Sequence, residues 1–79
     1  MARNPRVAVI DQDPASSAEV QKLLSVAGFS VVGTAGYGIE AVSLAKTSEP
    51  DVVVVAIEEP IVRALQSIEA IADLLLRNP

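Results

Sequence analysis

Several residue types that carry common protein chemistry are missing from this chain of 79 residues. It contains no cysteine, no histidine and no tryptophan. The lack of cysteine and histidine excludes disulfides, thiol chemistry, an ordinary zinc site and any Ser/His or Cys/His nucleophile. Aromatic residues make up only 3% of the chain, so its core must be formed by valine, isoleucine, leucine and alanine.

Positive charge is also scarce, because 6 basic and 10 acidic side chains give a formal net charge of −4. An acidic domain without a basic cluster is a poor match for nucleic acid or for an anionic membrane, and we expect neither as a partner. No apolar run approaches the roughly 18 residues that span a bilayer. The apolar stretch near the N-terminus is short and interrupted by Asp11, unlike a signal peptide. We therefore expect a cytoplasmic protein.

Apolar residues are abundant instead, at 51% of the chain. This excludes a disordered segment. The length allows one domain, residues 1–79. A domain of this size buries only about 60% of the surface that its unfolded chain exposes. So high an apolar content in so small a domain suggests that part of its surface meets another chain.

Short β-branched runs alternate with helical patterns along the whole sequence. Strands are expected at 6–11, 29–35 and 51–57, and helices at 13–28, 39–49 and 60–78. This alternation, with short connections, predicts parallel strands joined by right-handed crossovers. We therefore predict an α/β fold made of three βα units of a flavodoxin-like sheet. The strand order is 2-1-3, with the first helix on one face and the other two helices on the opposite face.

The apolar patterns also predict which surfaces are buried. The first and third strands are apolar throughout, which is typical of parallel strands covered on both faces. Helical spacing places apolar residues on one side of each of the last two helices. We expect this apolar side of each helix to face the core. These are Ile39, Val42 and Ala45 in the second helix, and Ile61, Leu65, Ile68, Ala72 and Leu75, widened by Ile71 and Leu74, in the third.

Acidic residues follow the first predicted strand, where Asp11 and Asp13 frame Gln12. Carboxylates at the carboxyl edge of a parallel sheet commonly hold Mg²⁺, which prefers oxygen ligands. In the alternative interpretation, Asp13 caps the following helix and Asp11 is a solvated strand end. Both interpretations remain open from the sequence.

Two further stretches have a chemical and a structural interpretation. The glycine-rich "GTAGYG", residues 33–38, is either a phosphate-binding loop or a turn, and it matches neither of the standard nucleotide-binding patterns. Glu58 and Glu59 follow the third strand and are either a catalytic carboxylate pair or a loop and first helical turn, where the helix dipole favours negative charge.

In this order, these pieces resemble the first three-fifths of the receiver domain of bacterial response regulators, over about residues 6–76, which implies a truncated receiver-like domain. The resemblance is carried by "VAVIDQDP", by the glycine before the second strand, by the small-residue loop with its "G-x-E-A" helix opening, and by "PDVVVV". It implies a family chemistry of phosphoryl transfer to an aspartate at the end of the third strand, beside a bound magnesium ion. The family's proline that follows the phosphorylation loop matches Pro60.

The chain departs from the family at the positions that carry this chemistry. The phosphate-accepting aspartate corresponds to Ala56, which has no nucleophilic oxygen. Of the family's acidic pair, Asp11 is kept, the usual metal ligand is replaced by Gln12, and Asp13 stands one place further along. The family's later hydroxyl and lysine residues have no counterpart here. The resemblance therefore implies a degenerate receiver that binds no metal or other cofactor.

These observations lead to two expectations for function. The first is a non-phosphorylatable receiver-like module, not an enzyme, for protein–protein interaction or regulation in bacterial signalling or assembly. It is similar to the degenerate receivers at the N-terminus of MinD-like ATPases of pilus assembly. Its partner is another protein or a second copy, bound through the third strand or the third helix, because an apolar edge strand recruits another strand. The alternative is a small nucleotide- or phosphate-binding protein that uses Asp11, Gly33 and Gly36.

Overall fold

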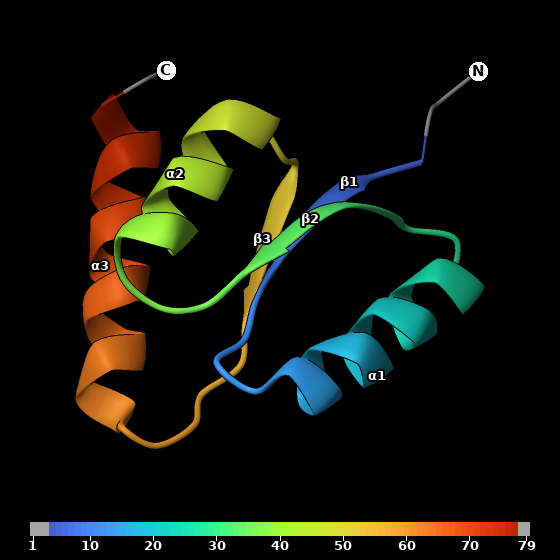
Figure 1. Ribbon diagram of the computed structural model, residues 1–79. Coiled ribbons are helices and arrows are strands. Elements are labelled where there is room, and N and C mark those ends of the chain that lie inside the picture. The colour runs from blue at the N-terminus through green and yellow to red at the C-terminus, as the bar shows by residue number, and fades with distance from the viewer. Residues whose placement is uncertain (1–3, 78–79) are drawn as a thin grey trace.

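The computed structural model describes residues 4–77, which form alternating strands and helices (Figure 1). The elements are β1 (Arg6–Ile10), α1 (Pro14–Val26), β2 (Ser30–Ala35), α2 (Ile39–Ser48), β3 (Val52–Val55) and α3 (Ile61–Arg77). All predicted elements are confirmed in type and order. The largest boundary differences are in α1 and β3, each of which is shorter than predicted by one residue at its start and two at its end.

The strands form one parallel sheet in the order β2-β1-β3, as predicted. β1 lies in the middle and pairs with both neighbours. Its ladder with β3 continues past the strand ends, where the backbone N–H of Ala56 donates to the carbonyl oxygen of Ile10 at 2.9 Å. Helix α1 covers one face of the sheet, and α2 and α3 lie together on the other (Figure 1). This is the arrangement of a flavodoxin-like α/β fold.

Local sequence signals explain where α1 begins and ends. The Asp13 carboxylate accepts a hydrogen bond from the N–H of Ala15 at 3.0 Å, so it caps the first turn. Pro14 occupies the first helical position, where its missing N–H costs nothing. At the other end, Gly28 has a φ of 95°, which a glycine adopts without strain. The cap interpretation of Asp13 is thus confirmed.

The core is centred on β1 and on small side chains of the helices. Val7, Ala8, Val9 and Ile10 are at most 1% exposed, so β1 is buried on both faces as predicted. On the α2–α3 face, Ile10 packs in one cluster with Tyr37, Ala41, Ala45, Ala64 and Ile71. Most of the residues that α2 and α3 contribute to this cluster are alanines. Their small side chains let the two helices approach closely, which gives a thin but continuous core.

β3 differs from the prediction of a strand that is covered on both faces. Val52 is 46% exposed, and the other residues of β3 are only half-buried. The reason is its position in the sheet. β3 pairs with β1 on one side, and within residues 4–77 no strand pairs with its other side.

The predicted core face of α3 is only partly right: Ile71 and Leu74, which widen the predicted stripe, are buried and half-buried, but the stripe itself is not. Its buried residues are Ala64, Ser67 and Ile71, with Leu74 packed partly against the same cluster. The helix turns its small residues towards α2, where the Ser67 hydroxyl accepts a hydrogen bond from the N–H of Gly38 at 2.9 Å. The predicted stripe is therefore mostly exposed: Ile61 by 45%, Leu65 by 54%, Ile68 by 36% and Leu75 by 49%.

The apolar face predicted for α2 is only partly right. Ala45 is buried and Val42 is half-buried, but Ile39 is 85% exposed. Ala41, which the prediction omitted, is fully buried. The buried side of α2 is thus a row of alanines, and its bulkier residues lie at the margin.

Candidate functional site

The carboxyl ends of the strands bring together most of the residues singled out in the sequence. Asp11 and Gln12 follow β1, Ala56 and Glu58 follow β3, and Tyr37 lies in the loop between β2 and α2. Hydrogen bonds connect these three segments, as described below. The site is thus the edge at which a parallel α/β sheet usually carries its chemistry.

Asp11 is a buried carboxylate, not a solvated strand end. Its side chain is only 5% exposed, which contradicts the solvated interpretation. One carboxylate oxygen, Oδ1, accepts a hydrogen bond from the N–H of Asp13 at 2.9 Å. The other, Oδ2, is buried and receives no hydrogen bond from any ordinary donor among the described residues. Such an oxygen requires a partner, because an unpaired buried charge is costly.

Glu58 supplies that partner. Its Oε1 atom is the other buried side-chain oxygen without an ordinary donor in the described part of the chain. Burial opposes ionisation of Asp11, but hydrogen bonds from the Glu58 carboxyl, the Asp13 N–H and Ser16 outweigh it and lower the pKa of Asp11. The hydrogen bond to Asp11 raises the pKa of Glu58, and burial and repulsion from Asp11 and Asp13 add to that rise. When Glu58 is protonated, its proton can be donated to Asp11, which satisfies both buried oxygens.

This pair corrects the sequence interpretation of the two glutamates. Glu58 pairs with Asp11 across the sheet edge, and Glu59 is exposed in the loop before α3. The sequence offered a partial signal. An acid placed directly after an apolar strand lies at the same edge as the acids that follow the neighbouring strand. The resemblance instead assigns the reactive position to Ala56, two positions earlier.

Tyr37 connects all three segments and was missed in the sequence. It is the only tyrosine and is 4% exposed. Its hydroxyl donates to the carbonyl oxygen of Ala56 and accepts from the N–H of Glu58 at 3.0 Å. Its own N–H donates to the Gln12 side-chain oxygen at 2.8 Å. Gln12 and Tyr37 therefore hold the loops after β1, β2 and β3 together.

The glycines before α2 are explained by close packing. A Cβ atom on Gly33 would lie 2.5 Å from a methyl carbon of Leu44, and one on Gly36 would lie 2.9 Å from the Gln12 side-chain oxygen. Both positions therefore bring a neighbouring side chain against the backbone of this segment. Gly38 has a φ of 89°, which the turn into α2 requires. These contacts favour the turn interpretation of residues 33–38 over phosphate binding.

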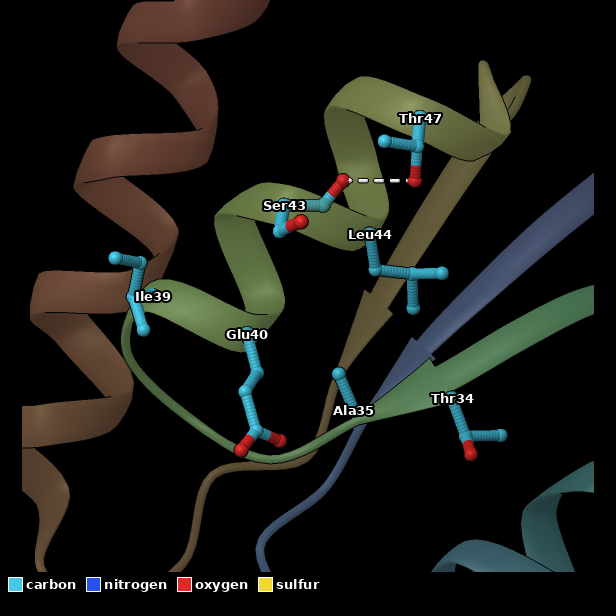
Figure 2. Close-up of a pocket in the computed structure, with 7 residues that line it drawn as sticks. All are labelled: Thr34, Ala35, Ile39, Glu40, Ser43, Leu44 and Thr47. Atoms are coloured by element: carbon cyan, nitrogen blue, oxygen red, sulfur yellow. Dashed lines mark hydrogen bonds between the residues drawn. The ribbon is translucent and has the colours of Figure 1, made fainter.

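Two surface pockets lie beside this segment. The larger, of about 480 Å³, runs between β2 and α2 (Figure 2) and is lined by Thr34, Ala35, Ile39, Glu40, Ser43, Leu44 and Thr47. Its one charged side chain, Glu40, is acidic and would repel a phosphate. The smaller, of about 230 Å³, is lined by Asp11, Gln12, Pro14, Ser17, Thr34, Ala35 and Gly36. Neither pocket contains a basic side chain to bind an anion.

The arrangement can hold a proton, but the position that the resemblance assigns to the phosphate acceptor has no side-chain oxygen. At Ala56 the side chain is a methyl group, and the carbonyl oxygen is occupied by Tyr37. Within residues 4–77 no group of three or more aspartate, glutamate, histidine or cysteine side chains is placed to hold a metal ion. The predicted positions Asp11, Gln12 and Ala56 lie together, whereas Asp13 is directed to the helix that it caps.

Replacing Glu58 with glutamine is expected to change how stability depends on pH. The raised pKa of Glu58 stabilises the fold below its ordinary value of 4.5, and this contribution is lost as pH rises through the raised value. The lowered pKa of Asp11 acts in the opposite sense, and its contribution is lost as pH falls below the ordinary 3.8. A glutamine amide donates to Asp11 at every pH. In the parent protein, the melting temperature should therefore decline as pH rises above 4.5. Glu58→Gln should abolish this decline and raise the melting temperature at pH 7.

Thermal melts followed by circular dichroism across this pH range test the expectation. The matched control is Glu59→Gln, which removes the same charge from the exposed neighbouring residue. It should retain the decline of the parent protein. An unchanged decline in Glu58→Gln would show that the carboxyl pair is not responsible.

Comparison with known proteins adds no assignment. A scan against protein-family models and a search of curated proteins each gave no match. In the part of the chain that the structure describes, no helix combines the length and apolar character needed to cross a bilayer.

Proposed function

We propose that this chain is a non-phosphorylatable receiver-like module that acts in the cytoplasm through protein–protein interaction or regulation, in bacterial signalling or assembly, and is not an enzyme. The observation that carries the proposal is that the polar groups at the sheet edge bond to the surrounding loops. Ala56 offers no acceptor oxygen, and Gln12 and Tyr37 use their polar groups to join the surrounding loops. The receiver-like architecture is kept, while its reactive positions serve the fold.

The proposed interaction surface consists of β3 and α3. This β3–α3 surface comprises the edge of Val52–Val55 that no strand of residues 4–77 pairs with, and the exposed α3 residues Ile61, Leu65, Ile68, Ala72 and Leu75. Contiguous exposed apolar residues on a small domain commonly mark a binding site. The partner is another protein or a second copy of this chain, bound through β3 or α3.

The nucleotide-binding alternative gains no support from a specific contact. The side chains of Leu44 and Gln12 pack against Gly33 and Gly36, and Asp11 interacts with Glu58. A bound nucleotide would also meet the acidic side chains of Asp11 and Glu40. A thermal-shift screen with nucleotides is therefore expected to be flat, whereas a ligand at 100 times its Kd would add about 2.7 kcal/mol of stability.

Treatment with acetyl phosphate, or with beryllium fluoride and Mg²⁺, is expected to leave the protein unchanged. The reason is that Ala56 has no nucleophilic oxygen and that Gln12 replaces a carboxylate. Intact-mass spectrometry and NMR spectra recorded with and without the reagents provide the measurement. The double variant Gln12→Asp with Ala56→Asp should recover Mg²⁺ binding.

An authentic receiver domain treated in parallel is the positive control for the reagents. An acid-labile phosphate on the parent chain would contradict the proposed function. Mg²⁺-dependent shifts of the parent's amides around Asp11 would do the same, because they would place a metal beside this carboxylate.

A further inference from the structure

The free edge of β3 exposes main-chain groups that need partners. Peptide groups alternate in direction along a strand, and the N–H of Ala56 points to β1. Val52 and Val54 therefore also direct their peptide groups to β1, and Val53 and Val55 direct theirs outward. No strand among residues 4–77 pairs with this side. Such an edge is a template for an added strand.

The exposed stripe of α3 is on the side of the helix that points away from α2 and past β3. Successive residues of a helix advance by about 100°. Ser67 faces α2, since it bonds to Gly38, and Ala64 and Ile71 face the core cluster that includes Val53 and Val55. Around the helix, Ser67 is followed by Ile71 and Ala64, and these are followed by the exposed stripe, whose centre is near Ile61. The stripe is therefore directed past β3, on the side away from α2.

We propose that the β3–α3 surface binds an extended segment of another protein, which adds to β3 as a strand and is covered by the stripe of α3. This inference rests on the proposed function and names its partner by chemistry. An extended segment satisfies both requirements at once: its main chain pairs with Val53 and Val55, and alternate apolar side chains pack against Leu65 and Ile68. Addition of a strand to a free sheet edge is a recurrent mode of peptide recognition.

The charges around this surface favour a partner with basic residues. Glu59 follows β3, and Glu69 borders the stripe on α3, one turn after Leu65; both are exposed. The arginines of α3 are directed elsewhere. The guanidinium of Arg63 lies beside Gly38, and that of Arg77 pairs with Asp73 at 3.2 Å. The margin of the surface is therefore acidic, and basic residues flanking the bound segment would complement it.

A second copy of this chain fits the surface less well. If two β3 edges paired about a two-fold axis, the strands would be about 4.8 Å apart. Each α3 is on the same side of the sheet as α2, and Val53 and Val55 of its own β3 pack against the cluster that contains Ala64 and Ile71. Two helices of about 10 Å diameter would then compete for the same space. The acidic residues of the two copies would also face each other.

A designed peptide of about nine residues tests the proposal. It alternates valine and threonine, so that one face is apolar and the other polar, and it carries lysine at both ends. NMR titration of the labelled full chain should shift the amides of Val53, Val55 and the α3 stripe. Leu65→Ser should weaken binding about tenfold, because a half-exposed leucine loses its contact with the peptide. The control is Val26→Ser, an 82% exposed residue on α1, which should bind as the parent does.

Two altered peptides separate the contributions of main chain and charge. A central proline removes a donor and should abolish binding, and terminal glutamates in place of lysines should weaken it severalfold. Absence of binding, shifts confined to other elements, or equal binding by Leu65→Ser would overturn the inference. So would a dimer in light scattering that Leu65→Ser dissociates, because a second copy would then occupy the surface. That last result would leave the proposed function standing, whereas phosphorylation of the chain would contradict the proposed function alone.

Discussion

Replacing Ile10 with alanine is expected to lower the free energy of unfolding by about 2–5 kcal/mol. Ile10 is fully buried at the end of the central strand and belongs to the cluster that joins the sheet to α2 and α3. Its removal leaves a cavity that the surrounding alanines are too short to fill. Small domains have a total stability of only about 5–15 kcal/mol, so a substantial unfolded fraction is expected. Urea denaturation followed by circular dichroism provides the measurement.

Ile39→Ala is the matched control, since it removes the same atoms from a side chain that is 85% exposed. Its effect should stay within about 0.5 kcal/mol. Similar losses in the two variants would mean that the core is not centred on β1. If Ile10→Ala is too unstable to purify, Ile10→Val gives the same comparison with an expected loss of about 0.5–1.5 kcal/mol.

Ala64→Leu is expected to destabilise the protein by about 1–3 kcal/mol through overpacking. Ala64 is fully buried in the cluster that joins α3 to α2 and the sheet, where neighbouring Ser67 and Ile71 are also buried. A leucine at this position would push α3 away and stretch the hydrogen bond between Ser67 and Gly38. Chemical denaturation gives the loss, and NMR shifts of the Gly38 amide report the displaced helix.

Ala70→Leu is the control, because it introduces the same side chain at an exposed position of the same helix. Leucine and alanine are both good helix formers, so little change is expected there. A large loss in both variants would point to an effect on the helix itself. An unchanged Gly38 amide in Ala64→Leu would show that the contact between α2 and α3 tolerates the added volume.

The sequence predicted the order of the elements well because each βα unit carries its own local signals. Asp13 and Pro14 begin α1, Gly28 ends it, and the valine run of β3 is short and β-branched. Alternation of such units leaves few parallel topologies, since crossovers are right-handed. These signals act between near neighbours in the chain and can be recognised without the tertiary structure.

The sequence could not predict which apolar side of α3 is buried. The helix is apolar over a wide arc that includes both Ile71 and Ile68, and hydrophobicity alone favours the bulkier side. The choice depends on fit against α2, where Ala64 and Ser67 permit the closest approach. Burial of the larger stripe would require cover on the far side of β3, which residues 4–77 do not provide.

The acidic site was only partly predictable, because its pairings also depend on contacts between residues that are distant in the sequence. Asp11, Gln12 and Ala56 were identified by position in the family pattern, and they do lie together. The pairing of Glu58 with Asp11 and the role of Tyr37 were missed because the partners, Asp11 and Ala56, are 47 and 19 residues away in the sequence. Pairing over such separations is decided by the register of β1 with β3.

The single tyrosine also makes this site observable by spectroscopy. The chain has no tryptophan, so its ultraviolet absorption above the peptide bands comes almost entirely from Tyr37. That phenol is buried and hydrogen-bonded to the loop after β3. Its near-ultraviolet circular dichroism and emission therefore report on one location, where the loops after β1, β2 and β3 meet. The unlabelled protein thus contains its own optical probe of the sheet edge.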